Sequence, residues 1–206
     1  MKVNERRMYH FRPVGYFDDF WKVGNEFDVD EKFESQIKRL TYLNNSIIHV
    51  DKFNGTIAKI LERHREKNYE YLSVGEAKFL FQKLESIIKN ENIMVRELAL
   101  EEFRQKNCPE LPSRFHSIWV ANKQSMKFWE HIFQGDTHYT RELLELELTG
   151  NLFKTSDEFL PDDGVCYQQC LDEAERYWFP NFKENYDPKK VEYLFQGHVR
   201  VREKLK

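Results

Sequence analysis

A long stretch with helical spacing separates two regions with strand character, and this arrangement constrains the fold more than any other feature. Across 30–107 apolar side chains recur every three or four residues, which is typical of amphipathic helices. Ser73 and Glu76 have the spacing of a capping box at a helix start. Pro109 and Pro112 prevent a helix from continuing, because proline lacks the amide hydrogen. We therefore expect 30–107 to be an almost wholly helical insertion.

Strands are predicted on both sides of this insertion, at 7–12, 115–121, 143–148 and 191–203, with short helices at 125–132 and 165–178. In 143–148 leucine alternates with glutamate, which is the period of a half-buried strand. Gln196-Gly197 predicts a bulge within the last strand. We expect one domain, residues 1–206, with an α+β fold.

Composition and charge exclude some classes of protein but do not identify a function. Of the 206 residues 40% are hydrophobic and 15% aromatic, which argues against disorder, and the net charge of −3 gives no overall reason to bind nucleic acid or an anionic membrane. No apolar run approaches the roughly 20 residues that cross a bilayer, and no signal peptide is expected. Three cysteines form no disulfide framework, and Cys166 and Cys170 lack a second pair to hold a metal. A cytoplasmic protein without metal is expected.

The common hydrolase, phosphate-loop and zinc-protease motifs are absent, so candidate residues are polar side chains within apolar strands. His10 and Arg12 flank Phe11 and share one face of a strand, where they form a site or simply face solvent. Arg114 stands at a strand entrance, where arginine often only meets solvent. Glu192 interrupts an apolar run, and alternation alone is also compatible with a solvent-facing glutamate.

Several of these short motifs occur together in the order of a known superfamily. They are Tyr9-His10-Phe11-Arg12, Pro112-Ser113-Arg114 through Trp119-Val120, Phe128-Trp129, Tyr177-Trp178 and Glu192 through Val199. Together they resemble an uncharacterised bacterial family that is similar in pattern to the ADP-ribosyltransferase superfamily. In that superfamily a first strand ends in His or Arg, a later strand supplies Ser, Thr or Tyr, and a late strand supplies Glu or Gln. The resemblance implies a split, mostly antiparallel β core of ADP-ribosyltransferase type.

The resemblance also implies NAD as substrate, no metal, and a protein or nucleic acid as the acceptor of ADP-ribose. Glu192 would stabilise positive charge on the ribose carbon of NAD, with His10 as a donor to the second ribose. Arg12 or Arg114 would bind the pyrophosphate, Ser113 or Ser117 would support the glutamate, and Trp119, Tyr177 or Trp178 would stack on a planar ring. His10 and Glu192 are then expected to open into one cleft.

Two details depart from the superfamily pattern, and two other functions stay open. Trp119 stands where a stacking tyrosine is expected, and no Glu-x-Glu pair precedes the late strand, which argues against an arginine acceptor. A toxin-like effector in bacterial or phage conflict fits by analogy. The alternatives are a catalytically inactive module of the same fold that binds a nucleotide or a protein, and an interaction protein with an aromatic surface.

Overall fold

The computed structural model describes residues 1–15, 19–35, 37–38, 47–50, 53–56, 59, 62, 65–66, 73–134, 140–183 and 186–206. The strands are β1 (Lys2–Pro13), β2 (Glu26–Val29), β3 (Ile47–Val50), β4 (Phe53–Thr56), β5 (Ile118–Val120), β6 (Arg141–Ser156) and β7 (Val191–Lys204). The helices are α3 (Val74–Asn107), α4 (Lys123–Gln134) and α5 (Tyr167–Trp178), with short 3-10 turns η1 (Arg114–His116), η2 (Asp157–Phe159) and η3 (Pro188–Lys190). The described residues thus have a mixed α/β structure.

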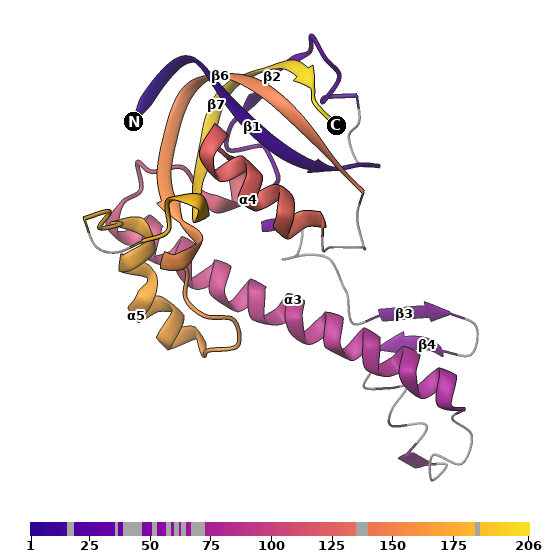
Figure 1. Ribbon diagram of the computed structural model, residues 1–206. Helices are drawn as coiled ribbons and strands as arrows, with labels where there is room; N and C mark the ends of the chain where they lie inside the picture. The colour runs from indigo at the N-terminus through magenta and orange to yellow at the C-terminus, as the bar shows by residue number, and fades with distance from the viewer. Residues whose placement is uncertain are drawn as a thin grey trace.

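The main sheet is antiparallel and returns on itself. Its strands lie in the order β1-β6-β7-β2, and β5 also pairs with β7 (Figure 1). A bridge between Tyr9 and Ala121, with N···O distances of 2.9 and 2.8 Å, joins the end of β5 to β1. Backbone pairing therefore runs in a circuit through β1, β6, β7 and β5. The predicted antiparallel character of the sheet is confirmed.

The two faces of β7 contribute to two different hydrophobic cores. Tyr193 and Phe195 belong to a core shared with β1, β2, β5 and β6. Leu194, on the opposite face, packs in a second core with Tyr177 and Trp178 of α5 and with residues of α3. Successive side chains of a strand point to opposite faces, so β7 is buried on both sides over this stretch. In this part of β7, the position of a residue in the strand therefore decides which of the two cores its side chain joins.

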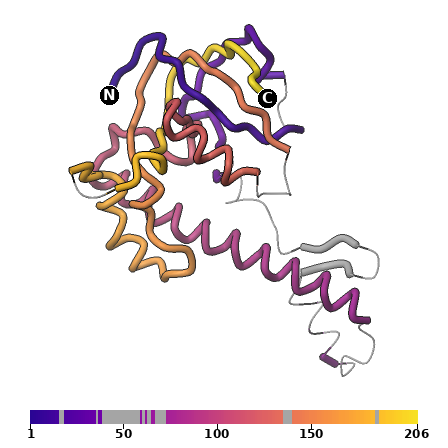
Figure 2. Tube along the Cα trace, in the orientation of Figure 1, coloured from indigo at the N-terminus to yellow at the C-terminus, as the bar shows by residue number. Residues whose placement is uncertain are grey.

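Helix α3 begins as the sequence predicts. The Ser73 side chain accepts from the Glu76 amide at 3.3 Å, and the Glu76 carboxylate accepts from the Ser73 amide at 2.8 Å, which completes the capping box. The helix runs for 34 residues and ends immediately before Cys108 and Pro109. Figures 1 and 2 show it passing alongside α5, with its N-terminal half reaching beyond α5 and away from the main sheet.

The expected helical insertion is corrected within 30–107. Helix α3 covers its C-terminal part, but β3 and β4 form an antiparallel pair in the same region, so the region is not almost wholly helical. The run Ile47, Ile48 and Val50 is β-branched, and such residues favour strands; spacing alone overlooked this preference. The other helices expected here fall largely on residues outside the described set.

The predicted bulge at Gln196-Gly197 is also wrong. The register between β6 and β7 shifts at Glu145/Leu146 instead, and Gly197 pairs regularly with Gly150. Gly197 has a φ of +138°, and a Cβ added to it would lie 2.5 Å from the Thr149 carbonyl oxygen and 2.7 Å from the Cα of Gly150. Glycine is needed here because the two backbones approach closely, not because the strand carries an extra residue.

Gly197→Ala is expected to lower the free energy of unfolding by about 1–3 kcal/mol, through overlap and an unfavourable φ. Urea denaturation measures this loss. Gly75→Ala, in the first turn of α3, is the control because nothing lies within 4 Å of its added Cβ; its stability should stay equal or rise. Equal stability of the Gly197 variant and wild type would contradict the close approach.

Candidate functional site

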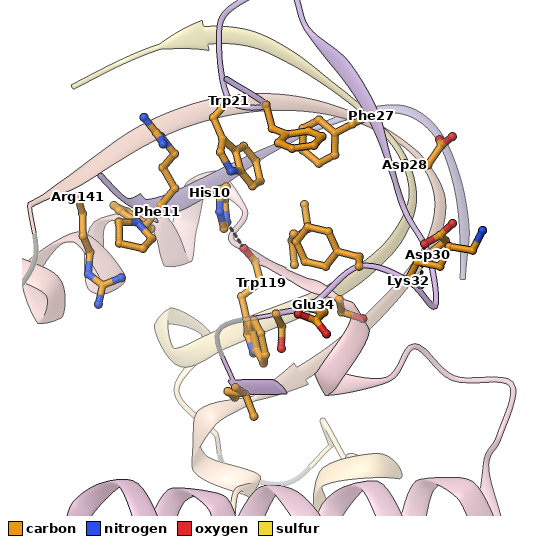
Figure 3. Close-up of a pocket in the computed structure, with 18 of the residues that line it drawn as sticks. His10, Phe11, Trp21, Phe27, Asp28, Asp30, Lys32, Glu34, Trp119 and Arg141 are labelled. Carbon is orange, nitrogen blue, oxygen red and sulfur yellow. Dashed lines mark hydrogen bonds between the residues drawn. The ribbon is translucent and has the colours of Figure 1, made fainter. Parts of the chain in front are cut away.

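A cavity of about 640 Å³ opens between the end of β1, strand β2 with the segment after it, and the start of β5 (Figure 3). Its walls are largely aromatic and include Trp21, Phe27, Phe33 and Trp119. Trp21 packs edge-on against Phe27, with ring centroids 4.9 Å apart. The volume lies within the roughly 300–1,000 Å³ of pockets that bind cofactor-sized molecules. Aromatic walls of this kind suit a ligand with a flat ring.

His10 is held in one orientation at the wall of this cavity. Its ring stacks on Trp21 at 4.6 Å with an interplanar angle of 22°, and its Nδ1 lies 2.7 Å from the Trp119 carbonyl oxygen. A carbonyl oxygen only accepts, so Nδ1 carries the hydrogen and Nε2 is left as an acceptor. The sequence-based expectation was that His10 donates a hydrogen bond to a ligand. In the structure Nε2 would instead accept one.

The surroundings of His10 keep it uncharged. Burial, and to a smaller extent the positive charges of Arg12 and Arg141, lower the pKa of His10 to about 4, although the hydrogen bond to the Trp119 carbonyl opposes this shift. At neutral pH the ring is thus a neutral acceptor.

Ser117 adds a second polar group to the cavity wall. Its side chain is fully buried, and its Oγ has no hydrogen-bond partner among the described residues. A buried hydroxyl without a partner costs about 1–3 kcal/mol. The oxygen has no surface open to the cavity, so a ligand would reach it only after the side chain or the wall around it moves.

Cationic side chains gather where β1 meets β6. Arg12 donates from Nε and Nη2 to Glu142 Oε2 at 2.8 and 2.6 Å, and Lys204 pairs with the other oxygen of Glu142 at 2.5 Å. Arg141 lies with its guanidinium 4.4 Å from the Phe133 ring centroid. The hydrogen bond from Lys204, together with Arg12, lowers the pKa of Glu142. Arg12 and Arg141 thus bring two guanidinium groups to this part of the cavity wall, and Arg12 is paired with Glu142.

The remaining predicted residues form a separate buried ion-pair network on the α3 and α5 side of the sheet. Arg114 binds Glu97 with two bonds, Nε–Oε2 at 2.5 Å and Nη2–Oε1 at 2.9 Å, and its Nη1 lies 3.0 Å from Glu192 Oε1. Nη1 also donates to the Tyr177 hydroxyl, which in turn donates to Glu192 Oε1 at 2.6 Å. Ser113 donates to Glu101 at 2.9 Å and so does not support Glu192.

Charge balance within this network sets its protonation. Burial alone lowers the pKa of Arg114, but the neighbouring negative charges of Glu97 and Glu192 hold it well above its usual value. Burial raises the pKa of Glu192, and the charge of Arg114 opposes that rise. Burial also raises the pKa of the Tyr177 hydroxyl, which stays protonated and donates. The Arg114 guanidinium therefore stays charged, and the other groups of the network bind to it.

The structure divides the predicted site residues into two groups. His10, Arg12, Ser117 and Trp119 line the cavity, whereas Ser113, Arg114, Tyr177 and Glu192 belong to the buried network. Glu192 is not among the residues that line this cavity, so the expectation that it shares a cleft with His10 is not met. The reason is strand alternation: Glu192 points with Leu194 toward the second core, while His10 shares a face of β1 with Met8 of the first core.

Trp119 lies between the two groups. Its ring lines the cavity, and the guanidinium of Arg114 lies 5.2 Å from its centroid. Tyr177 and Trp178 do not serve as stacking surfaces, because both are buried and the Trp178 indole donates to the Leu100 carbonyl at 2.8 Å. The buried network thus packs against one wall of the cavity through a single aromatic ring.

Sequence reasoning missed several residues of the site. Trp21 lies in a segment whose aromatic richness is visible in the sequence, and that richness was a usable signal. Phe33 and Arg141 line the cavity without any pattern that would have pointed to them. The resemblance extends to Arg96-Glu97, but the bidentate bond between Glu97 and Arg114 was not predicted, because the charged residues of this helix otherwise resemble a solvent-facing surface.

Comparison with known proteins places the chain in a family. Residues 8–206 match the family model described as "Protein of unknown function (DUF2441)". The chain belongs to this family. No curated protein matches it. Among the described residues, no helix combines the length and apolar character needed to span a membrane.

Arg114→Gln is expected to lower the free energy of unfolding by about 3–5 kcal/mol, because it leaves two buried carboxylates without their cation. Chemical denaturation at neutral pH measures this loss. The control is Arg7→Gln, which removes an exposed ion pair with Glu145 and should change stability by less than about 1 kcal/mol. A similarly small change for the Arg114 variant would contradict the central place of the guanidinium.

Proposed function

We propose that the aromatic cavity binds a nucleotide, with NAD as the ligand that the superfamily resemblance implies. The observation that carries this proposal is His10: a neutral, oriented imidazole whose Nε2 is left to accept a hydrogen bond within an aromatic cavity. A ribose hydroxyl is a suitable donor to that atom. The ADP-ribosyltransferase type of the β core belongs to the same proposal.

Each part of a dinucleotide has matching chemistry in the cavity. Trp119, Trp21 and the phenylalanines offer faces and edges to a planar base. Arg12 and Arg141 supply positive charge for phosphates, and arginine suits phosphate because its donors form a planar fork. Ser117 Oγ would add a hydrogen bond to a ribose or an amide only after a movement of the wall that exposes it. The cavity thus combines stacking surface, an acceptor and cations within one volume.

Calorimetric titration with NAD and ADP-ribose tests this binding. His10→Phe keeps a ring beside Trp21 but removes the acceptor, and it should weaken NAD binding about 10-fold, the size of one good hydrogen bond. The matched control is His131→Phe on α4, an exposed residue outside the cavity lining, which should leave affinity unchanged. Because the pKa of His10 is about 4, affinity should be flat between about pH 6 and pH 8.

Absence of NAD and ADP-ribose binding by the wild-type chain would overturn the nucleotide proposal. Equal affinity of wild type and His10→Phe would remove His10 from the site while leaving the cavity itself in question. A melting temperature for each variant shows whether the fold is retained.

A second proposal is the enzymatic activity that the resemblance implies, transfer of ADP-ribose to a protein or nucleic acid. The bond between nicotinamide and the ribose anomeric carbon would break, nicotinamide would leave with the bonding electrons, and an acceptor oxygen or nitrogen would attack that carbon and lose its proton. The observation that favours it is the position of Glu192 in β7. Leu194, two residues further along β7, pairs with Trp119 of β5, so Glu192 lies close in the sheet to a residue of the cavity wall. Its carboxylate would meet the ribose only if Trp119 and Arg114 shift.

Glu192→Gln tests this activity separately from binding. Nicotinamide release from NAD, measured with a cell lysate as the source of acceptor, should fall about 10²–10³-fold, while NAD affinity stays the same. Burial raises the pKa of Glu192, so any stability that this group contributes is present at low pH and is lost as the pH rises. At pH values above the ordinary glutamate pKa of about 4.3, the melting temperature of the variant should therefore be no lower than that of wild type. NAD binding without any nicotinamide release would establish a binding module instead.

A further inference from the structure

The N-terminal half of α3 exposes an apolar stripe with a seven-residue repeat. Val74, Phe81 and Ile88 are 88%, 71% and 58% exposed, and each lies seven residues from the next. Ala77 and Leu84 are half-buried and lie between them at the alternating spacing of three and four. We call these five residues the α3 stripe. An apolar repeat of 3.5 residues is the pattern by which one helix packs along another.

The α3 stripe lies on the part of the helix that does not pack on α5. The C-terminal half of α3 contributes Leu100 to the second core, where the Leu100 carbonyl accepts from the Trp178 indole. The N-terminal half extends past α5 and away from the main sheet (Figures 1 and 2). At about 1.5 Å per residue, 74–88 presents roughly 21 Å of helix, which is enough for two heptads to meet another helix.

The residues beside the stripe select the partner and its direction. One flank carries exposed Lys78 and Glu85, and the other carries Leu80 and Ile87, which are buried and half-buried. In a parallel helix pair the charged flank of one helix faces the opposite flank of its partner, so Glu85 would meet Leu80 rather than a charge of opposite sign. In an antiparallel pair the charged flanks face each other. A second copy of the same helix then places Lys78 opposite Glu85 twice, once on each side of a twofold axis.

We propose that the α3 stripe is the contact between two copies of this chain, with their α3 helices antiparallel and the twofold axis close to Phe81. The interface is isologous, because the same five residues serve both copies. Two heptads are a short contact, so the dimer dissociates on dilution.

Oligomeric state against concentration tests the contact, by light scattering coupled to gel filtration or by sedimentation. The wild-type chain should pass from monomer to dimer as concentration rises. Phe81→Glu should stay monomeric, whereas the control Gln82→Glu, on the neighbouring exposed position, should behave as wild type. Lys78→Glu should weaken the dimer, and Lys78→Glu combined with Glu85→Lys should restore it. A wild-type monomer at every concentration, or no rescue by the charge exchange, would overturn the proposal.

Cross-linking through introduced cysteines tests the direction of the helices, in a chain whose exposed Cys166 is replaced by serine. Phe81→Cys lies beside the twofold axis and should form a disulfide with its own copy under oxidation. Val74→Cys should not, because an antiparallel arrangement separates the two copies of residue 74 by about 21 Å along the helices at 1.5 Å per residue. Disulfides at both positions would show a parallel pair and would contradict the antiparallel assignment. Melting curves confirm that each variant is folded.

Discussion

The guanidinium of Arg114 is the interaction on which the rest of the structure depends. It binds Glu97 from α3, Glu192 from β7 and Tyr177 from α5, so one charge joins the long helix, the short helix and the sheet. Removing two carboxylates and a guanidinium from water is costly, and the bidentate bond between Arg114 and Glu97 is the main contact that offsets this cost. The network therefore links the packing of α3 to that of α5.

The cavity is connected to this network through one residue, Trp119. Trp119 presents its ring to both sides, and its carbonyl oxygen fixes the ring of His10. The three-residue strand β5 thus carries the wall, the orientation of the imidazole and the contact with Arg114. The nucleotide proposed for the cavity would contact Trp119 and His10, and the positions of both depend on packing against Arg114 on the other face of the sheet. Binding there and stability of the helical layer are expected to be linked for this reason.

Local features of this fold were predictable from the sequence, and features that depend on register were not. The capping box at Ser73 and the Leu/Glu alternation in β6 follow from interactions within a few residues. Whether Glu192 faces the cavity or the helices depends on which face of β7 packs on which core, and no spacing within 191–203 decides that. The protonation of His10 required knowledge of a carbonyl 109 positions away in the chain. The role of Gly197 likewise depends on a glycine in another strand, which a bulge interpretation could not reveal.

The circuit of strands has a consequence for how the chain reaches its structure. Strand β7 pairs with β2, β5 and β6, yet it lies C-terminal to all of them, and β1 pairs with β6 across more than a hundred residues of intervening chain. Pairing of this kind brings distant segments together before contacts repay the lost entropy, which slows folding. During synthesis on a ribosome, the earlier strands emerge without their central partner and expose unpaired edges. The chain thus passes through an interval in which its own sheet does not yet protect these edges from aggregation.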